Sequence, residues 1–382
     1  MIKELQHLYQ YQSRGYPVRH RRKVPFKPEM RVTDDFISME NKIREYDSEL
    51  DRFILSSNDY RELIIDAYSS NVHKTTSLEG NPLSENEVKR ITRRTFDGSN
   101  SLENEVGPAK EIVNHLKFPA ILSFFRFPWT HEKIKTMHSM LLEGISRQST
   151  LSSYRETRAN IVTDDHGQEL FIPCPPEHIE AEMNSLLEWV NNEASAYNPI
   201  VGATVFFHEF ESIHPFQDGN GRVGRSLFNI FLRNLGYKNL HKCKIENFIL
   251  GDPELYYQLL AFTDDSGSYR ELIDMFTISI LKCYEQTIDE YRKKDLLGRD
   301  LDENSKRLLL LAKKNGAAFT IKEANNWVDG IGYQSVRYKL NELVELGGLR
   351  KIGKGRGLKL VFNDPMISIL GSEESSRDTK KV

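Results

Sequence analysis

The residues best suited to chemistry lie together between His214 and Arg225. This segment reads His-Pro-Phe-Gln-Asp-Gly-Asn-Gly-Arg-Val-Gly-Arg, so a histidine, a carboxylate, a Gly-Asn-Gly turn and two arginines fall within twelve positions. The histidine is the side chain in this segment that can take up a proton near neutral pH. Apolar residues precede and follow the segment at helical spacing. We therefore expect a base on a tight turn between two buried helices.

The middle of this segment has the composition of a phosphate-binding turn. Gly219 and Gly221 permit backbone angles and close approaches that side chains forbid, and successive amides that lead into a helix bind anions. Arg222 and Arg225 are three positions apart, so both point from one side of the helix, with forks that match phosphate oxygens. Asp218 beside the turn is a natural Mg²⁺ ligand. A plain helical connection with solvated arginines is the alternative, and the number of matching residue types disfavours it.

The whole segment resembles the active-site motif of the Fic family, His-x-Phe-x-(Asp/Glu)-Gly-Asn-Gly-Arg-x-x-Arg, at every specified position. The resemblance implies a helical fold and transfer of AMP from ATP to a hydroxyl group of a target protein. It also implies a role for each residue. His214 would deprotonate the target hydroxyl, Phe216 would anchor the loop and Asp218 would hold Mg²⁺. The α- and β-phosphates would be bound by Gly219, Asn220, Gly221 and Arg222, and the γ-phosphate by Arg225. A related branch that phosphorylates its targets has lysine where this chain has Gly221, so the resemblance argues against phosphorylation here.

A second segment of interest, residues 75–81, follows a predicted helix. Gly80 would end that helix, which places Glu79 at the negative end of the helix dipole, where a carboxylate needs a nearby cation. The segment is similar to the inhibitory motif of Fic proteins, (Ser/Thr)-x-x-x-Glu-(Gly/Asn), with Thr75, Glu79 and Gly80 matching. This resemblance implies an ion pair between Glu79 and Arg225 in the space that the γ-phosphate needs, because one guanidinium cannot serve both groups. A chance helix end is the alternative.

Residues 151–176 change from helical to strand patterning. Two short apolar runs surround an Asp/Gly-rich turn, which predicts a β-hairpin. Its position resembles that of the flap of Fic proteins, which implies that Ile161, Val162 and Phe171 would hold a segment of the target by edge-strand pairing. An ordinary surface hairpin is the alternative.

Two tyrosines after the motif are candidates for contact with the adenine ring. Tyr256 and Tyr257 resemble the family segment that packs against the base, a role that aromatic faces suit. Packing in the core explains both residues nearly as well. Asp264 departs from the family pattern, because some relatives have asparagine near the base at this place. The adenine contacts therefore stay open.

The composition is that of an ordinary soluble protein with two or three domains. The chain has 382 residues, of which 39% are hydrophobic and 28% are charged, and its formal net charge is −3. A general attraction to nucleic acids or membranes is therefore not expected. The three cysteines, Cys174, Cys243 and Cys283, are widely spaced, which favours a reducing compartment. With neither a long apolar run nor a signal-peptide core in the sequence, we expect a cytoplasmic protein without a membrane span.

Residues 301–363 resemble a winged helix-turn-helix domain. Three predicted helices precede a hairpin with a glycine-rich basic tip, and residues 301–362 contain 12 Lys and Arg against 6 Asp and Glu, a net charge of +6. Gln334, Ser335, Arg337 and Tyr338 would begin the recognition helix. Basic charge suits DNA phosphates, but such domains also bind proteins, and the sequence does not decide between the two partners.

The predicted fold is mainly α: a Fic helical-bundle core with a β-hairpin flap, followed by an α+β winged-helix domain. The predicted divisions are an N-terminal arm and helix at 1–57 whose first 36 residues are solvated, a Fic domain at 58–290 with an inhibitory helix at 58–80 and a flap at 158–173, a linker at 291–300, the winged helix at 301–363 and a disordered tail at 364–382.

The leading hypothesis is a protein adenylyltransferase that uses ATP and Mg²⁺ and is inhibited by its own Glu79. One alternative is a DNA-binding regulator whose Fic domain senses nucleotide. Another is a Fic enzyme that removes AMP, with Glu79 positioning a water molecule. The sequence leaves open the target protein, the modified Ser, Thr or Tyr hydroxyl, and any association of the chain into a homodimer.

Overall fold

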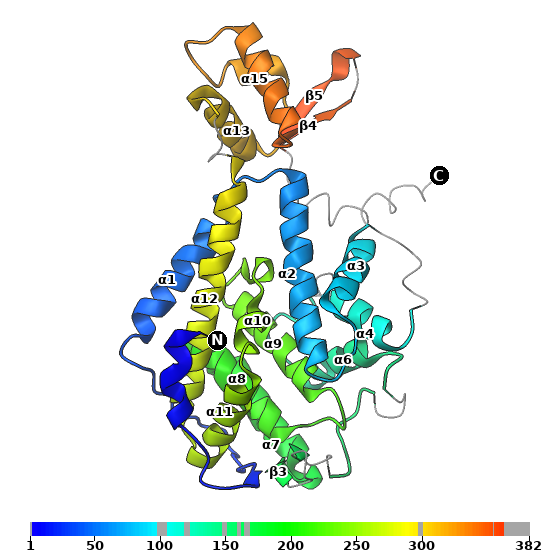
Figure 1. The fold of residues 1–382 in the computed structure, drawn as a ribbon, viewed down its shortest axis with the longest axis vertical. Helices are drawn as coiled ribbons and strands as arrows, with labels where there is room; N and C mark the ends of the chain where they lie inside the picture. The colour runs from blue at the N-terminus through cyan, green and yellow to red at the C-terminus, as the bar shows by residue number, and fades with distance from the viewer. Residues whose placement is uncertain are drawn as a thin grey trace. The chain divides into compact units, whose positions relative to one another are not determined.

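The computed structural model describes residues 2–97, 105–117, 123–146, 151–158, 162–163, 169–296, 301–353 and 355–362. Helices dominate these residues, as predicted, and the described strands form two small sheets (Figure 1). Among the described helices, none combines the length and the apolar character that crossing a membrane requires. The chain divides into two compact units, one with the described residues of Met1–Asp47 and Asp66–Glu285, the other with those of Ser48–Ile65 and Gln286–Val382. This division assigns residues 58–65 to the second unit, whereas we predicted that they begin the Fic domain.

The first unit is built around helices α8 (Pro199–Ile213) and α9 (Asn220–Asn234), which pack against each other on either side of the motif turn. Helix α8 begins after Asn198, whose side chain accepts a hydrogen bond from the Ile200 amide at 2.9 Å, and Pro199 fits its first turn because proline needs no helical donor there. Both helices are largely buried, which confirms the prediction of a turn between two buried helices.

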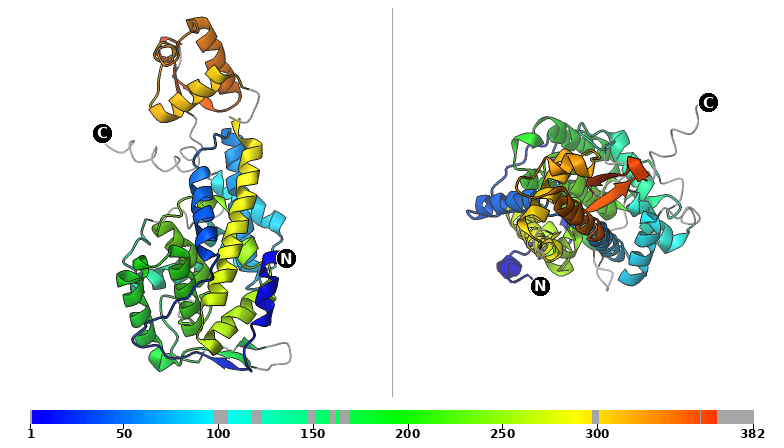
Figure 2. Two further views of the ribbon diagram at one scale, coloured as in Figure 1. Left: turned by 90° about the vertical axis from the view of Figure 1, so that its left-hand side faces the viewer. Right: turned by 90° about the horizontal axis from the view of Figure 1, so that it is seen from above.

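Further helices surround this pair (Figures 1 and 2). Helix α4 begins at Gly107-Pro108, and α2 is capped by Ser56, whose hydroxyl accepts from the Asp59 amide at 3.1 Å. The helices are α1 (Phe36–Glu49), α2 (Ser57–Ser77), α3 (Glu85–Phe96), α4 (Gly107–Leu116), α6 (His131–Leu142), α7 (Pro176–Asn192), α10 (Ile245–Ile249), α11 (Pro253–Ser266) and α12 (Arg270–Lys294), with 3₁₀ turns at Lys3–Gln10, Ala194–Ala196 and Leu240–Lys242.

The predicted hairpin is present and belongs to a three-stranded sheet. Strands β2 (Val162–Thr163) and β3 (Glu169–Ile172) are antiparallel, with Val162 opposite Phe171. A third strand, β1 (Val18–Arg19), pairs in parallel with the other edge of β3. The chain's own N-terminal arm therefore occupies one edge of β3, a pairing that no pattern in the sequence predicted. Ile161 and the turn at 164–168 lie outside the described residues.

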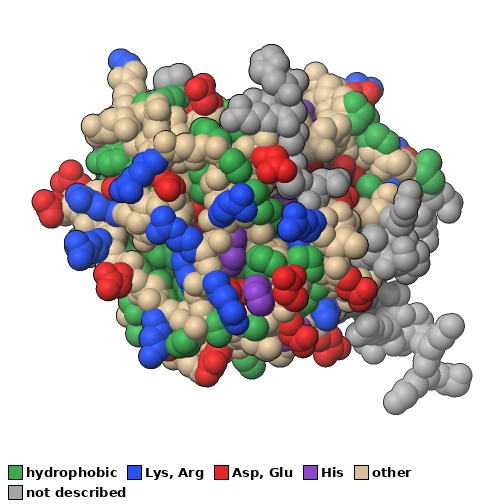
Figure 3. All heavy atoms as spheres, turned by 90° about the horizontal axis from the view of Figure 1, so that it is seen from below, with side chains coloured by type: hydrophobic (Ala, Val, Ile, Leu, Met, Phe, Trp, Pro, Cys, Tyr) green, Lys and Arg blue, Asp and Glu red, His purple; other side chains and the backbone are tan. Residues whose placement is uncertain are grey.

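The N-terminal arm is not the solvated segment that we expected. The ammonium group of Lys23 lies 2.6 Å from a carboxylate oxygen of the buried Glu209 and donates to the hydroxyl of Tyr269 at 2.9 Å. Phe26 is buried edge-on against Trp189. These partners lie more than 150 positions further along the chain, so the sequence of the arm alone could not reveal them. On the face of the molecule that Figure 3 shows, acidic and basic side chains are interspersed.

The second unit contains the predicted elements in the predicted order. Its helices are α13 (Glu303–Asn315), α14 (Ile321–Asn325) and α15 (Tyr333–Glu345), and its strands β4 (Leu349–Ile352) and β5 (Lys359–Phe362) form an antiparallel hairpin around a 3₁₀ turn at Gly355–Gly357. Apolar residues at helical spacing, including Leu308, Val336 and Leu340, form its core with strand residues Leu349 and Leu360. The assignment of this unit to the winged helix-turn-helix class stays a prediction.

Candidate active site

His214 ends helix α8 in a left-handed conformation, with φ of 53°. Its Nδ1 atom lies 3.2 Å from the carbonyl oxygen of Glu211. Because a carbonyl can only accept, Nδ1 carries the proton and Nε2 keeps its lone pair. Burial lowers the pKa of His214 to about 4, against weaker opposing effects that include the Glu211 hydrogen bond. The imidazole is therefore neutral at pH 7 and presents an unprotonated nitrogen, as a general base requires.

Arg155 fixes the backbone on which His214 stands. Its side chain donates to the carbonyl oxygens of His214 at 2.7 Å and Ile213 at 3.3 Å, and its amide donates to the carbonyl of Pro215 at 2.9 Å. The guanidinium also bonds the carbonyl of Cys174, just beyond the flap. Sequence reasoning assigned no role to this residue. In the sequence, Arg155 stands between Tyr154 and Glu156 ahead of the hairpin, and neither neighbour indicates its role.

The loop after His214 is held from inside. Phe216 is fully buried and its ring stacks on the imidazole of His138, with centroids 3.9 Å apart. The side chain of Asn220 accepts from the amide and donates to the carbonyl of Phe216, both at 2.8 Å. Phe216 therefore has the anchoring place that the resemblance implied. The side chain of Asn220 also serves the loop, which leaves only its backbone for a phosphate.

The turn itself opens into the amide end of α9. Gly219 precedes the helix with φ of 81°, and a Cβ atom there would lie 2.5 Å from a methyl group of Leu142. The positive φ favours glycine here, and a side chain would also displace the Leu142 methyl group. The first amides of a helix have no carbonyl acceptor within the helix, so those of Asn220, Gly221 and Arg222 give the N-terminal end of α9 an arrangement that suits an anion.

Arg222 lies between two carboxylates. Its guanidinium is 2.5 Å from a carboxylate oxygen of the buried Glu111 and 2.7 Å from one of Asp218. The Asp218 side chain is 55% exposed and also accepts from the hydroxyl of Ser146 at 2.9 Å. Glu111 in turn accepts from the Asn81 amide group at 2.7 Å, two residues beyond Glu79. Sequence reasoning missed Glu111, because a glutamate on a distant helix carries no local signal.

Arg225 is held by the end of helix α2. Its side chain donates to the hydroxyl of Thr75 at 2.7 Å and to the carbonyl of Thr75 at 3.2 Å, and it forms a 2.7 Å ion pair with Glu79. Burial opposes the positive charge, but Tyr256 and Glu79 hold the pKa of Arg225 above its usual value. A Cβ atom at Gly221 would collide with the Glu79 carboxylate and lie 2.7 Å from the Arg225 guanidinium. The ion pair thus lies directly over the glycine turn.

The two candidate tyrosines, Tyr256 and Tyr257, differ in their exposure to solvent. Tyr256 is 1% exposed, packs against Phe207 and interacts with Arg225, so its side chain belongs to the core. Tyr257 is 50% exposed and can still meet a ligand. Asp264 is buried and accepts from the hydroxyl of Ser212 at 2.6 Å. Phe171 of the flap is half-buried.

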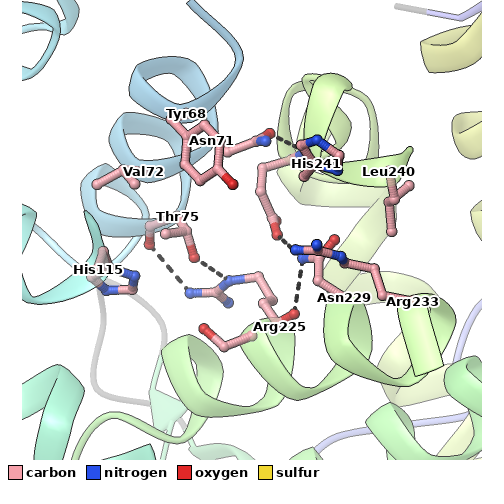
Figure 4. A pocket seen from close by; sticks show the side chains of 12 residues that line it. Tyr68, Asn71, Val72, Thr75, His115, Arg225, Asn229, Arg233, Leu240 and His241 are labelled. Atoms are coloured by element: carbon pink, nitrogen blue, oxygen red, sulfur yellow. Dashed lines mark hydrogen bonds between the residues drawn. The ribbon is translucent and has the colours of Figure 1, made fainter. Parts of the chain in front are cut away.

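A cavity of about 100 Å³ lies behind Arg225, between α2 and α9. Figure 4 shows Tyr68, Asn71 and Thr75 on its α2 wall, with Arg225 and Arg233 across from them. Small-molecule sites usually enclose roughly 300–1,000 Å³, so this space is too small for a nucleotide. On the side that faces the glycine turn, Arg225 is paired with Glu79.

Comparison with known proteins agrees with the resemblance of this site to the Fic family. Residues 128–232 match the model of the Fic/DOC family. The chain is 28% identical over 257 residues to "Protein adenylyltransferase Fic" of Nematostella vectensis, which covers 66% of this chain and 55% of that protein. It is 25% identical over 190 residues to "Protein adenylyltransferase fic-1" of Caenorhabditis elegans, covering 46% and 34%.

A solved structure of a Fic family protein from Desulfovibrio desulfuricans shares the fold, with a TM-score of 0.58 at 18% identity, and the match covers 88% of this chain and 98% of that one. This chain spans about a third to a half of the length of the relatives it matches by sequence. Residues 128–232 are therefore similar to the domain that defines the Fic/DOC family.

Proposed function

We propose that this protein transfers AMP from ATP to a Ser, Thr or Tyr hydroxyl of a target protein, and that Glu79 holds it inactive. The observation that carries the proposal is the arrangement of three groups around one turn. A neutral imidazole presents Nε2, helix α9 presents its free amides, and Arg222 and Arg225 lie on the following turns. The printed names of the relatives, protein adenylyltransferases, support the same activity.

The residues have complementary tasks in this reaction. The target oxygen attacks the α-phosphorus of ATP and passes its proton to Nε2 of His214. A new oxygen–phosphorus bond forms, the bond between the α-phosphorus and the bridging oxygen breaks, and pyrophosphate leaves with the electron pair. The amides of the turn and the arginines stabilise the negative charge that builds up on the phosphates.

Asp218 fits the role of metal ligand. It is an exposed carboxylate directly before the turn, within hydrogen-bond reach of a hydroxyl and a guanidinium. Mg²⁺ commonly takes one or two carboxylates and completes its shell with phosphate oxygens and water. When bound, the ion would neutralise phosphate charge. When Mg²⁺ binds, Asp218 would have to release its ion pair with Arg222 or share its carboxylate between Arg222 and the ion.

Inhibition follows from the position of Glu79. Its carboxylate uses the guanidinium that would bind the γ-phosphate and brings negative charge to that space. Its side chain is 25% exposed, so it can leave toward solvent without opening the core. The hydrogen bonds from Arg225 to Thr75 would hold the C-terminal end of α2, and with it Glu79, next to the guanidinium.

The test is incorporation of label from ATP that is radioactive at its α-phosphate. The Glu79→Gly variant should label itself or candidate target proteins in the presence of Mg²⁺, and His214→Ala added to it should abolish the label. ATP labelled only at the γ-phosphate serves as the control, since AMP transfer leaves it unincorporated. Absence of α-label in the Glu79→Gly variant with every target would reject the activity.

The flap would hold the target by strand pairing, with Phe171 near the docked segment. Because β1 already pairs with one edge of β3 and β2 with the other, the docked segment would use the outer edge of β2. Substitution of Phe171 should then raise KM for the target protein and leave the KM for ATP unchanged.

A second function, binding of duplex DNA, is favoured by one observation on the second unit. Gln334, Ser335 and Arg337 are exposed at the start of α15, and Tyr338 is 72% exposed beside them. This is the place of a recognition helix. Binding of duplex at low salt that weakens as salt rises and is lost in Arg337→Ala would support it. Absence of binding at low salt would leave protein recognition as the role of this surface.

A further inference from the structure

We propose that His20, Cys174 and Glu182 form a site for a divalent transition-metal ion, with Zn²⁺ as the best fit, that ties the N-terminal arm to the flap and to helix α7. The three side chains offer a nitrogen, a sulfur and an oxygen atom that all lie within 4.8 Å of one another. They come from three separate segments, since His20 follows β1, Cys174 follows β3 and Glu182 lies within α7. This site does not contact the reacting groups, so it goes beyond the proposed function.

The site is buried. The His20 and Glu182 side chains are each 2% exposed, and Cys174 is 1% exposed. Within the described part of the chain, His20 Nε2 and the Glu182 Oε1 atom make no hydrogen bond. Buried polar atoms are nearly always paired, so an unpaired nitrogen that faces a carboxylate needs an explanation.

The hydrogen bonds next to His20 show which of its ring nitrogens carries the proton. The hydroxyl of Ser212 donates to Asp264 at 2.6 Å, so its oxygen is free to accept from His20 Nδ1, which lies 2.8 Å away. With the proton on Nδ1, Nε2 of His20 carries a lone pair. It lies 3.9 Å from Oε2 of Glu182, which accepts from the Lys23 amide at 3.1 Å. The Nε2 lone pair therefore has no donor to meet it, and a proton or a metal ion between Nε2 and the Glu182 carboxylate would give it a partner. Metal-binding histidines usually donate their other N–H to such a partner.

Cys174 supplies a sulfur ligand to this cluster, since its Sγ atom and the donor atoms of the other two side chains all lie within 4.8 Å of one another. A coordinating metal ion deprotonates a thiol outright. Zn²⁺ with one thiolate and one carboxylate is then electrically neutral, which suits a buried place. Arg22, whose guanidinium lies 3.6 Å from Glu182 and whose side chain is 58% exposed, can turn to solvent.

The geometry requires a small contraction. Zinc–ligand distances of 2.0–2.3 Å in a tetrahedron place donor atoms roughly 3.3–3.8 Å apart, so the three side chains would move inward by about 1 Å. Nitrogen, sulfur and carboxylate ligands together are typical of zinc. Three protein ligands leave a fourth position for water.

The place of the site suggests what the ion would do. The Cys174 amide donates to the carbonyl of Ser212 at 3.4 Å, and the Cys174 carbonyl accepts from Arg155, which holds the loop of His214. An ion on Cys174 would therefore stabilise the arm, the end of the flap and the back of the active-site loop together.

The test measures metal in the purified full-length chain. After dialysis against chelator-treated buffer, the wild type should retain about one Zn²⁺ per chain by elemental analysis, and Co²⁺ exchanged into it should show thiolate-to-cobalt charge-transfer absorption. Both signals should disappear in Cys174→Ala, and retention should fall in His20→Ala. Cys243→Ala and Cys283→Ala are matched controls, since both cysteines are also buried and should keep both signals.

A wild-type chain that retains no zinc and gives no cobalt spectrum would overturn the proposal, as would a Cys174→Ala variant that keeps both. X-ray absorption of the wild-type zinc protein gives an answer that does not depend on the folding of any variant. A shell with one sulfur and nitrogen or oxygen neighbours supports the site, and a shell without sulfur rejects it. None of these readouts depends on AMP transfer.

Discussion

Glu79 and Arg225 are 146 positions apart in the chain, and their carboxylate and guanidinium lie 2.7 Å from each other directly over the glycine turn of the site. The guanidinium is buried, whereas the carboxylate is partly open to solvent. The ion pair can therefore break on the Glu79 side alone, if a phosphate takes over the charge of Arg225. Under the proposed function, the γ-phosphate of ATP would replace Glu79 in this contact.

The first prediction concerns release of this contact. Glu79→Gly should raise the initial rate of AMP transfer by at least about tenfold, which corresponds to roughly 1.4 kcal/mol, because Arg225 becomes free for the γ-phosphate. The measurement is label incorporation at subsaturating ATP. Glu79→Gln, which keeps the shape without the charge, should give an intermediate rate. Equal rates for the wild type and Glu79→Gly would show that the ion pair does not limit activity.

The second prediction concerns the pH dependence of the same variant. Burial lowers the pKa of His214 to about 4, so the base stays unprotonated throughout the neutral range. We expect kcat/KM to change little between pH 8 and pH 6 as far as this group is concerned. A histidine with its ordinary pKa of 6.5 would lose activity roughly fourfold at pH 6. A fourfold fall that follows a single ionisation near pH 6.5 would contradict the burial of His214.

The third prediction concerns stability. Burial lowers the pKa of His138 to about 4 against an unfolded value near 6.5, so the unfolded chain binds a proton that the folded chain does not. The stability is fully present above pH 6.5 and is lost as the pH falls toward 4. Between pH 8 and pH 5 this group should cost about 2 kcal/mol. His138→Gln, compared with the wild type by denaturant unfolding at both pH values, should lose less stability on acidification. An equal loss in both proteins would assign the effect to other groups.

Much of the site could be predicted from the sequence because its residues are close together in the chain. The turn, His214, Phe216 and the arginines fall within twelve positions, and the predicted helices on either side formed as expected. Glu79 was found through a short motif, and its partner contact is present.

What escaped prediction depends on contacts between distant segments. Arg222 meets Glu111 across 111 positions, and Lys23 meets Glu209 across 186. Neither glutamate differs locally from a surface residue of a helix, so periodicity cannot mark it as a buried partner. The two adjacent tyrosines show the same limit, since Tyr256 is buried and Tyr257 is half exposed, and only the direction of each side chain on α11 distinguishes them.

The last prediction concerns Arg155, which we assign as a positioning residue. Its side chain and amide bond three successive carbonyls of the loop, those of Ile213, His214 and Pro215. Arg155→Lys in the Glu79→Gly background keeps the charge but cannot reach the same carbonyls together, because a single ammonium has no planar fork. The loop would then shift, and a displacement of about 1 Å at a catalytic group can cost roughly a hundredfold in rate.

We therefore expect kcat to fall by roughly tenfold to a hundredfold, with little change in the KM for ATP. Arg158→Lys is the matched control, because this neighbouring arginine is exposed and should leave both constants unchanged. Circular dichroism and the melting temperature check that the Arg155 variant is folded. A folded Arg155→Lys protein with an unchanged kcat would show that the other contacts of the loop, such as those of Asn220 with Phe216, are sufficient to place His214.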